Sequence, residues 1–416
     1  MFQYHLLDLQ NVMLAPWAQS ARTVGAWLRS PFSLLYHTEI GESLAALSTL
    51  FEQSTRSYKK PSFNFQQTRF RGDLVQICEK TVCREPFYQL LNFSRTSETP
   101  STQEHIEQDP KVLVIPPMAG HFSTLLRGAI EPMLASHNVF VIDWVDAKMV
   151  PLTDGFFDLE DQIEAIIRCI ETIGPEVHIL TASQASVSSL CAVAILAAQN
   201  HIAQPLSLTL LGGPVDARNR AGLLAQPAQT HSLSWFRKTH SQLVPLYYPG
   251  ALRMVYPGIM QLLDRMALTL DRHVTEQIKY YQYLVRGDED AAENHKKFYE
   301  EFLCVMDVPE EFYIQLIERA YQRCDLPNGS FTWRGQKVDL AAIEKTAILT
   351  VEGELDDLSP AGQTRAALGL CTNLSDGKKR SHLEINVGHY GIFNGRKWRN
   401  NIQPMIHKFI REHSAP

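Results

Sequence analysis

Apolar residues along this chain occur in two alternating patterns. Short and nearly continuous apolar runs occupy residues 111–115, 139–142, 177–182, 206–211 and 347–351. Runs of this kind are typical of parallel strands that are buried on both faces. Between them lie stretches with helical periodicity, such as a helix expected through Cys169, with Asp158 as its cap and Asp161 in its first turn. The alternation predicts an α/β fold in which helices cover both faces of a mainly parallel sheet.

The remaining segments show weaker patterns. At the start, an apolar stripe of helical spacing is formed by Leu6, Leu7, Leu9, Val12 and Met13. A polar segment before the first central strand is rich in Ser, Thr, Glu and Gln, which is typical of an exposed loop. The elements expected outside the central alternation are helices within 1–60 and at 397–412, strands at 74–78, 87–93 and 383–387, a turn at 83–86 and a loop at 94–110.

Composition and charge exclude several classes of protein. The net charge is −6, and no basic tract is longer than Lys378-Lys379-Arg380, so binding to nucleic acid is not expected. The start of the chain does not resemble a secretory signal, and no apolar run is long enough for a transmembrane segment. Seven scattered cysteines without a Cys-x-x-Cys pair argue against a disulfide framework or a zinc site. We therefore expect mostly buried cysteines, a cytoplasmic location, and neither a metal nor a cofactor.

Three residues of complementary chemistry each follow an apolar strand. They are Ser183 after residues 177–182, Asp356 after residues 347–353, and His389 after the strand expected at 383–387. An imidazole can take the proton of a serine hydroxyl, and a carboxylate can orient and stabilise that imidazole. The chain order Ser, Asp, His is the order found in the α/β-hydrolase fold. These residues predict a catalytic triad at the carboxyl edge of the sheet.

The choice of the acid depends on spacing. Asp356 and Asp357 are adjacent candidates. The spacing Gly353-x-x-Asp356-x-x-x-Pro360 is frequent after the seventh strand of this fold and favours Asp356. Asp357 is better explained as an acidic residue at the start of a helix near Pro360.

An oxyanion hole is expected beside the serine. The backbone N–H of Gln184 should provide one donor, and the loop after residues 111–115, with Met118 and Ala119, should provide the other. Thr181 and Ala185 stand where Gly-x-Ser-x-Gly motifs have glycine. His121 follows this loop, and it is assigned to substrate binding, with a structural or supporting role as the alternative.

The middle of the chain interrupts the alternation. Residues 215–340 have a helical pattern and many aromatic residues, and α/β-hydrolases usually carry a cap at this place in the order of strands. The domains expected are an N-terminal helical extension at 1–70, a first core part at 71–214, a cap at 215–340 and a second core part at 341–416.

Several segments resemble intracellular polyhydroxyalkanoate depolymerases over nearly the whole chain. The segments that carry this resemblance include residues 4–10, 116–127, 143–147, 298–302, 305–307, 310–313, 350–354 and 388–393. The resemblance implies hydrolysis of ester bonds in poly(3-hydroxybutyrate), stored as cytoplasmic granules, with Asp356 as the acid and His389 as the base.

One departure from this family concerns the nucleophile. Its better-known intracellular members have a cysteine before the glutamine that matches Gln184, usually followed by proline, whereas this chain has Ser183 and Ala185. Two explanations are consistent with the sequence: a native serine with ordinary serine-ester chemistry, or a serine introduced to trap substrate. The serine argues against a polyester synthase, which uses cysteine.

The expected partner is therefore a polyester at the surface of a storage granule, and a homodimer is left open. Two other functions fit the same residues. One is an esterase that acts on soluble esters or 3-hydroxybutyrate oligomers, because this fold hosts many chemistries. The other is a granule-associated protein with weak catalysis, which the substitutions at Thr181 and Ala185 would support.

Overall fold

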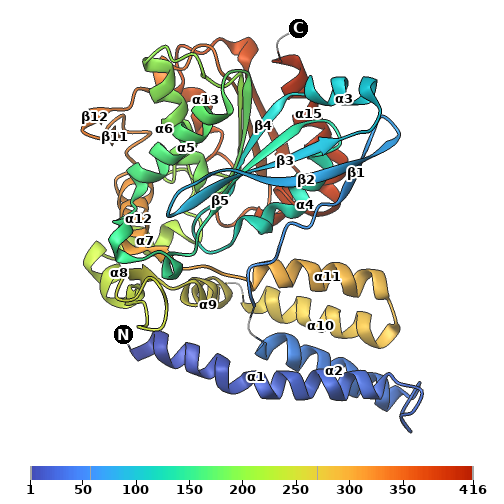
Figure 1. Ribbon diagram of the computed structural model, residues 1–416. Helices are drawn as coiled ribbons and strands as arrows, with labels where there is room; N and C mark the ends of the chain where they lie inside the picture. The colour runs from blue at the N-terminus through green and yellow to red at the C-terminus, as the bar shows by residue number, and fades with distance from the viewer. Residues whose placement is uncertain (1, 57, 269, 415–416) are drawn as a thin grey trace.

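A large twisted sheet forms the centre of the molecule (Figure 1). A computed structural model describes residues 2–56, 58–268 and 270–414. Over these residues the sheet has nine strands in the order β1-β2-β3-β5-β4-β6-β7-β13-β14. The bounds of the strands are β1 Gln67–Phe70, β2 Asp73–Arg84, β3 Tyr88–Thr96, β4 Lys111–Ile115, β5 Asn138–Trp144, β6 Val177–Ala182, β7 Ser207–Leu211, β13 Ala347–Gly353 and β14 Lys379–Glu384.

The order and direction of these strands define the fold. Strands β5, β4, β6, β7, β13 and β14 are parallel neighbours, whereas β3 pairs antiparallel with β2 and β5. If the short β1 is set aside, the other eight strands follow the order 1-2-4-3-5-6-7-8. This is the α/β-hydrolase fold, so the predicted fold class is confirmed.

Helices cover both faces of the sheet, as the alternating pattern predicts. One face is covered by α5 (Leu159–Ile173) and α6 (Ala185–Ala198), and the other by α4 (Arg127–Met133) and α15 (Gln403–Glu412). The cap expected for α5 is present, since the Asp158 carboxylate accepts the backbone N–H groups of Glu160 and Asp161. The central strands are buried on both faces, which explains their continuous apolar runs.

The chain between β7 and β13 is mainly helical, as expected, but it also contains short strands that no pattern revealed. Strands of two or three residues are too short to show a period of two. The boundaries of the cap and of the other predicted domains stay a prediction. The elements of this insertion are α7 Ala225–Thr230, α8 Leu233–His240, β8 Gln242–Leu243, β9 Met254–Tyr256, α9 Gly258–Leu268, α10 Leu270–Arg286, α11 Glu289–Phe302, β10 Val308–Pro309, α12 Glu310–Leu316, β11 Thr332–Trp333 and β12 Gln336–Lys337.

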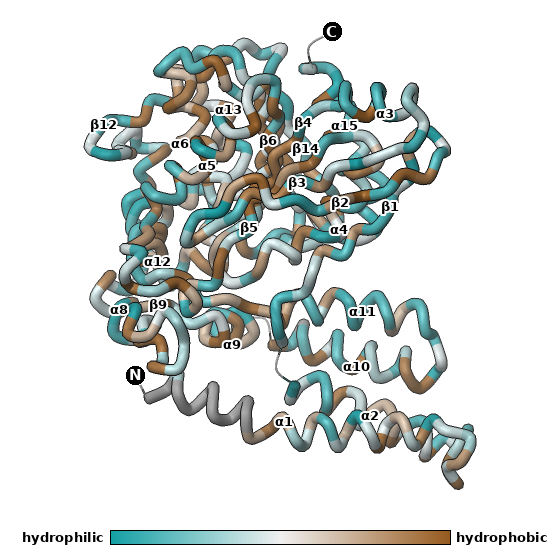
Figure 2. Tube along the Cα trace, viewed as in Figure 1, coloured by the Kyte–Doolittle hydropathy of each residue, from teal (hydrophilic) through white to brown (hydrophobic). Residues whose placement is uncertain are grey.

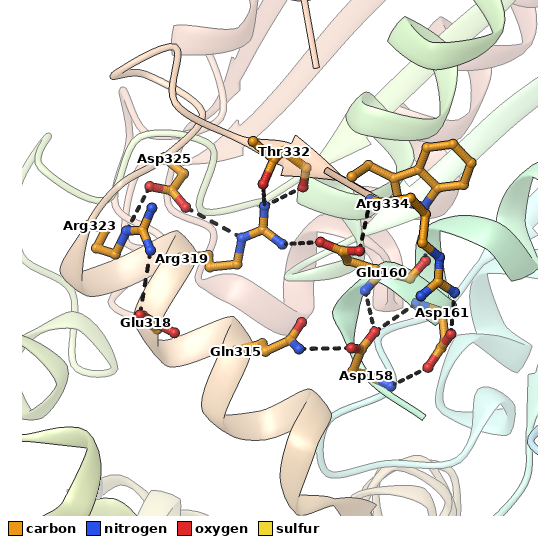
Figure 3. Close-up of polar contacts among 11 residues, drawn as sticks. Asp158, Glu160, Asp161, Gln315, Glu318, Arg319, Arg323, Asp325, Thr332 and Arg334 are labelled. Atoms are coloured by element: carbon orange, nitrogen blue, oxygen red, sulfur yellow. Dashed lines mark hydrogen bonds and ion pairs between the residues drawn. The ribbon is translucent and has the colours of Figure 1, made fainter. Parts of the chain in front are cut away.

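A π-helical turn, η4 (Ile317–Gln322), continues α12 and is held against the core by a polar network. Arg319 is 8% exposed, lies over the ring of Phe331 at 3.9 Å, and pairs with Glu160 on α5 at 3.1 Å. It also contacts Asp325, as Figure 3 shows. A buried guanidinium is tolerated only when its charge and donors are satisfied, and this network satisfies them. The network therefore fixes η4 relative to α5.

The chain begins with a helical hairpin. The predicted helices are α1 (Phe2–Leu28) and α2 (Glu39–Thr55), which pack on each other, and α2 packs on α10 (Figure 1). The hydroxyl of Tyr4 donates to the Asp307 carboxylate, and the backbone N–H of Asp307 donates to Asp146 at 3.1 Å. The hairpin is thereby tied to both the insertion and the core. Met13 is exposed, whereas the other side chains of its predicted stripe lie outside the described residues.

Three sequence predictions are wrong in detail. Residues 94–110 are not a loop, because β3 runs to Thr96 and α3 spans Pro100–Glu107. The strand expected at 383–387 is β14, which spans Lys379–Glu384. It is a half-exposed edge strand, so polar residues form most of it. The turn expected at 83–86 starts later, because β2 includes Arg84.

The remaining helical segments are short. The helix expected at 397–412 is present, although a π-helical turn interrupts it. No helix among the described residues has both the length and the apolar character needed to cross a membrane. The segments are η1 Ser123–Leu126, η2 Ala147–Met149, η3 Leu152–Asp154, η5 Leu340–Ala342, α13 Ala366–Leu370, η6 Asp376–Lys378, η7 His389–Ile392, α14 Gly395–Lys397 and the π-helical turn η8 Trp398–Ile402.

Candidate active site

Ser183 stands at a sharp turn between β6 and α6. Its φ angle is +55°, in the left-handed region that residues with a side chain rarely adopt. The backbone N–H of Ser183 donates to the Leu211 carbonyl on β7 at 2.7 Å, and its own carbonyl accepts from Ser186 at 3.0 Å. A strained residue that its neighbours hold in place is typical of functional sites. The turn lifts the hydroxyl above the carboxyl edge of the sheet.

The structure shows how the turn accommodates residues other than glycine on both sides of Ser183. Thr181 is fully buried, and its hydroxyl accepts a hydrogen bond from Ser189 at 3.1 Å. The close approach instead requires Gly213 in the loop after β7. A Cβ at Gly213 would lie 2.3 Å from Cβ of Ser186 and 2.9 Å from the Ser183 carbonyl oxygen. At this turn the residue that must be glycine is therefore Gly213, in the loop after β7, whereas positions 181 and 185 accept larger residues.

The three residues predicted as a triad converge above the sheet. Nε2 of His389 lies 3.1 Å from Oγ of Ser183, and Nδ1 of His389 lies 2.8 Å from Oδ2 of Asp356. His389 is 5% exposed, and it starts the short helix η7 after β14. These are hydrogen-bond distances along one path from carboxylate to hydroxyl. The arrangement can move a proton from the serine to the imidazole.

The contacts of the acidic pair distinguish its two members. The second oxygen of Asp356, Oδ1, accepts the backbone N–H groups of Leu358 and Ser359, both at 2.9 Å. The adjacent Asp357 accepts the backbone N–H of Leu223 at its carbonyl oxygen at 2.8 Å, and it is one of the residues that line a smaller neighbouring cavity. The structure thus places Asp356, and not Asp357, against His389.

A buried carboxylate that the sequence did not single out anchors the loop after β13. Glu352 is 5% exposed and accepts the backbone N–H groups of Gly362, Thr364 and Arg365 at 2.8–3.0 Å. Bonds to a charged acceptor are roughly twice as strong as neutral ones. Glu352 therefore holds the loop that carries Asp356.

The residues expected to form the oxyanion hole are only partly brought together. Gln184 is the first residue after Ser183 and precedes α6, where backbone N–H groups are free of helical bonds. Gln184 and Ala119 both line the cavity that contains Ser183. Met118 is fully buried in the core and is not part of the cavity wall. Among the three, Gln184 and Ala119 have the position that the chemistry needs.

Gly120 brings a cationic residue of the insertion close to this loop. Its φ angle is +94°, and a Cβ at this position would lie 2.3 Å from Nη2 of Arg265 on α9. The backbone conformation therefore favours glycine, and a side chain here would displace the guanidinium of Arg265. Arg265 lies on the wall of the cavity, and nothing in the sequence linked this insertion residue to the oxyanion loop.

His121 is 2% exposed, although it lies on the wall of the cavity. Its ring packs against Phe302 at 5.4 Å and Tyr390 at 6.2 Å between ring centroids. Burial, and then the charge of Arg265, hold the pKa of His121 well below its ordinary value, so the ring is neutral. The position fits contact with a substrate as well as support of Tyr390.

The cavity next to Ser183 has a volume of about 370 Å³ and lies between the core and the insertion. Burial raises the pKa of Tyr256 and of Tyr313, so both phenols stay neutral. Asp264 accepts from the Tyr256 hydroxyl and lies 3.4 Å from Nε2 of His240. The wall is mostly apolar and aromatic, with the aromatic side chains of Trp235, Phe236, Tyr256, Tyr313, Tyr321 and Phe393.

These features suit an uncharged, apolar substrate. Within the described part of the chain, no group of three or more His, Cys, Asp or Glu side chains is placed to hold a metal ion. Spacing along the chain could not reveal the aromatic wall, because its residues come from several elements of the insertion and from the segment after β14.

Comparison with solved structures returned lipases and esterases with low similarity. No curated protein matches the sequence. Three of the solved structures are a membrane phospholipase A described as a bacterial virulence factor (16% identity, 82% of this chain and 86% of that chain, TM-score 0.40), a monoacylglycerol lipase of Paleococcus ferrophilus (13%, 73% and 95%, 0.41) and a thermophilic esterase of Thermogutta terrifontis (11%, 84% and 100%, 0.40). At these scores the likeness carries no argument about activity.

A match to a protein family is more informative. Residues 212–414 match the family model described as PHB de-polymerase C-terminus. The matched segment contains the whole insertion, Asp356 and His389, and it begins after Ser183. This segment of the chain is thus similar to the C-terminal part of PHB depolymerases, and the chain is a carboxylic ester hydrolase with the α/β-hydrolase fold.

Proposed function

We propose that this chain hydrolyses the ester bonds of poly(3-hydroxybutyrate) through a Ser183–His389–Asp356 triad and an acyl-serine intermediate. The observation that carries the proposal is the hydrogen-bonded path from Asp356 through His389 to Ser183, which ends in an apolar cavity. The family match supports the polyester as substrate. The location we propose is the surface of storage granules in the cytoplasm.

The reaction follows from the geometry. His389 accepts the proton of Ser183 at Nε2 while Oγ attacks the ester carbonyl. The negative charge that develops on the carbonyl oxygen is stabilised by backbone N–H groups, for which Gln184 and Ala119 are the best-placed candidates. As the bond between the carbonyl carbon and the ester oxygen breaks, His389 protonates this departing alkoxide oxygen, which becomes the hydroxyl of the next unit, and the acyl group stays on Ser183. Water, activated by His389, attacks the acyl-serine and releases the acid.

Asp356 has two tasks in this reaction. Because Oδ2 accepts from Nδ1 of His389, the imidazole keeps its free lone pair on Nε2, toward Ser183. Because Oδ1 is held by two backbone N–H groups, the carboxylate cannot rotate away. A fixed negative charge also stabilises the imidazolium that forms during the attack.

Hydrolysis of soluble esters or short oligomers is the second candidate. The position of the cavity between the core and the insertion favours it, because a chain end or a small ester enters such a site more easily than the middle of a polymer. A granule-associated protein with weak catalysis is less well supported. The substitutions that suggested it, at Thr181 and Ala185, are both buried without disturbing the path to Ser183.

The experiment compares product release from amorphous poly(3-hydroxybutyrate) particles and from a soluble short-chain ester. The parent should hydrolyse both, and Ser183→Ala should hydrolyse neither. Activity on the ester alone would identify an esterase, and activity on neither would overturn the proposal. Equal activity of the parent and Ser183→Ala would remove Ser183 from the mechanism.

A Ser183→Cys variant addresses the departure from the cysteine-containing relatives. If the pocket suits a thiol, the variant should acylate on particles at least as fast as the parent, because a thiolate forms readily beside a histidine. If the pocket suits serine, activity should fall. Inactivation by an alkylating agent would identify the new thiol. Since Cys78 is exposed and Cys83 is half-exposed, the assay belongs in a background with both replaced by serine.

A further inference from the structure

The N-terminal hairpin has small residues inside and large apolar residues outside, the reverse of an ordinary helix pair. Where α1 and α2 meet, the buried positions include Ala18, Gly25, Gly41, Ala45 and Ala46. A Cβ at Gly25 would lie 3.4 Å from Cβ of Ser48, so the two helices approach closely. Around these small contacts, many of the large apolar side chains of both helices stay exposed, although Leu28 is buried.

On α1, the exposed apolar side chains form one stripe. They are Met13, Trp17, Val24 and Trp27, with exposed fractions of 65%, 65%, 48% and 52%. Their spacing of 4, 11 and 14 positions from the first places them on one side of the helix. Two half-exposed tryptophans on one stripe are costly in water, because each leaves a large apolar ring unburied.

The second helix and the connection repeat this arrangement. On α2 the spacing of Ile40, Leu44, Leu47 and Phe51 forms a stripe of the same kind, with exposed fractions between 44% and 65%. At the tip of the hairpin, Phe32 and Leu34 are 90% and 96% exposed. Brown segments recur along both helices and at this tip in Figure 2. We call the two stripes and the tip the hairpin surface.

Several charged side chains of the hairpin line a groove toward the rest of the protein. A groove of about 670 Å³ between the hairpin and α10–α11 is lined by Arg22, Arg29, Glu52 and Arg56. Arg56 pairs with Glu300 of α11 at 2.6 Å. Two exposed apolar stripes and an exposed apolar tip on one hairpin indicate contact with something apolar outside the molecule.

We propose that the hairpin surface docks the enzyme onto the uncharged surface of its water-insoluble polyester. This inference rests on the proposed function, which supplies an apolar substrate too large for the cavity at Ser183. Charge separates this occupant from an anionic membrane. Between residues 13 and 55 the hairpin has two arginines and three glutamates, a net charge of −1, whereas anionic lipids attract basic segments. A polyester presents methyl groups and neutral esters, which require no charge.

The test uses the full chain with Ser183→Ala, so that binding is measured without hydrolysis. Binding to amorphous poly(3-hydroxybutyrate) particles is measured by sedimentation, with and without Trp17→Gln and Trp27→Gln. Loss of two half-buried rings should weaken binding by about 100-fold, at roughly tenfold for each. Ile202→Gln with Leu246→Gln is the matched control. The two side chains are 83% and 73% exposed, respectively, and both lie outside the hairpin. The control should bind like the parent.

Activity separates this inference from the proposed function. In chains that keep Ser183, the tryptophan variant should retain its turnover of a soluble ester and lose hydrolysis of particles. If the parent lacks ester turnover, the proposed function fails. If the parent is active and the tryptophan variant binds particles as well as the control, only the docking surface is wrong.

Two further outcomes would overturn the inference in favour of another occupant. Equal binding to neutral phospholipid vesicles, lost in the tryptophan variant, would indicate a lipid surface. A parent that sediments as a dimer, and a tryptophan variant that sediments as a monomer, would indicate a second copy of the chain. If the variant does not fold, Leu34→Cys with an environment-sensitive dye replaces it, in the background with Cys78 and Cys83 replaced by serine. The emission should shift to the blue when particles are added, and an unchanged emission would exclude docking through the tip.

Discussion

Replacing Asp356 by asparagine tests the proposed triad at the contact that defines its acid. The native carboxylate uses both oxygens, since Oδ2 accepts from His389 at 2.8 Å and Oδ1 accepts from Leu358 and Ser359 at 2.9 Å each. Asparagine has one oxygen and one NH₂ group of almost the same shape. The substitution therefore preserves packing and forces a choice of which side keeps an acceptor.

The cost of each orientation decides the outcome. If the amide NH₂ faces the backbone N–H groups of Leu358 and Ser359, two buried donors lose their acceptor, at about 1–3 kcal/mol each. If the oxygen stays on that side, NH₂ faces Nδ1 of His389, which must then be unprotonated. The second orientation keeps an acceptor for both backbone N–H groups and therefore costs less free energy. It places the imidazole proton on Nε2, toward Ser183. The base can then no longer accept the serine proton.

We therefore expect Asp356→Asn to lower kcat by about 10³–10⁴, equivalent to about 4–5.5 kcal/mol in the barrier. The thermal midpoint should change little. The assay is turnover of a soluble ester together with a thermal unfolding scan. Asp357→Asn is the matched control and should change kcat less than about threefold, because Nδ1 of His389 is hydrogen-bonded to Asp356. The reasoning is refuted if Asp356→Asn keeps a tenth of the activity, or if Asp357→Asn has the larger effect.

Three further predictions follow from the local geometry. Ser183→Gly should abolish activity and raise the thermal midpoint relative to Ser183→Ala, because glycine adopts a φ of +55° without strain. A lower midpoint would contradict this. Gly213→Ala should destabilise the fold by more than about 2 kcal/mol in denaturant titrations and reduce activity, because the new Cβ collides with Ser186 at 2.3 Å. Normal activity would show that the turn relaxes freely. Burial and the neighbouring Asp307 raise the pKa of Asp146 to about 7, so the native state holds a proton that the unfolded chain releases near pH 4. Stability should fall as the pH rises from about 4 to about 7, and Asp146→Asn should flatten this part of the profile of unfolding free energy against pH.

The central strands were predictable because each is buried on both faces, so that local composition reports burial directly. The proximity of Ser183, Asp356 and His389 was predictable for a related reason: parallel strands bring their carboxyl ends to one edge, wherever they occur in the chain. The predictions for residues 94–110 and 383–387 were wrong for the opposite reason, because these segments are largely exposed. In α3 only Thr102 and Ile106 are buried, and β14 lies at the edge of the sheet, so both segments are largely polar.

The wall of the cavity is the part of the site that the sequence could not reveal. Arg265 comes within contact distance of Gly120 only because the insertion folds back over the core. No periodicity within α9 reports a contact with a loop that lies more than a hundred positions earlier. Only the aromatic richness of the insertion gave a signal, and it did not distinguish Tyr256, which faces the cavity, from Tyr280, which packs in the hairpin region.

The hydrogen bond from Tyr4 to Asp307 has a consequence for the synthesis of the protein. The two residues are 303 positions apart, so the first helix of the chain waits for its docking partner until most of the chain has been translated. At about 5–20 residues per second, roughly 15–60 s pass between the emergence of the two residues from the ribosome. During this time α1 and α2 are already formed or forming, with their tryptophans exposed. The nascent chain therefore presents an apolar hairpin to chaperones and to neighbouring chains before the body of the enzyme exists.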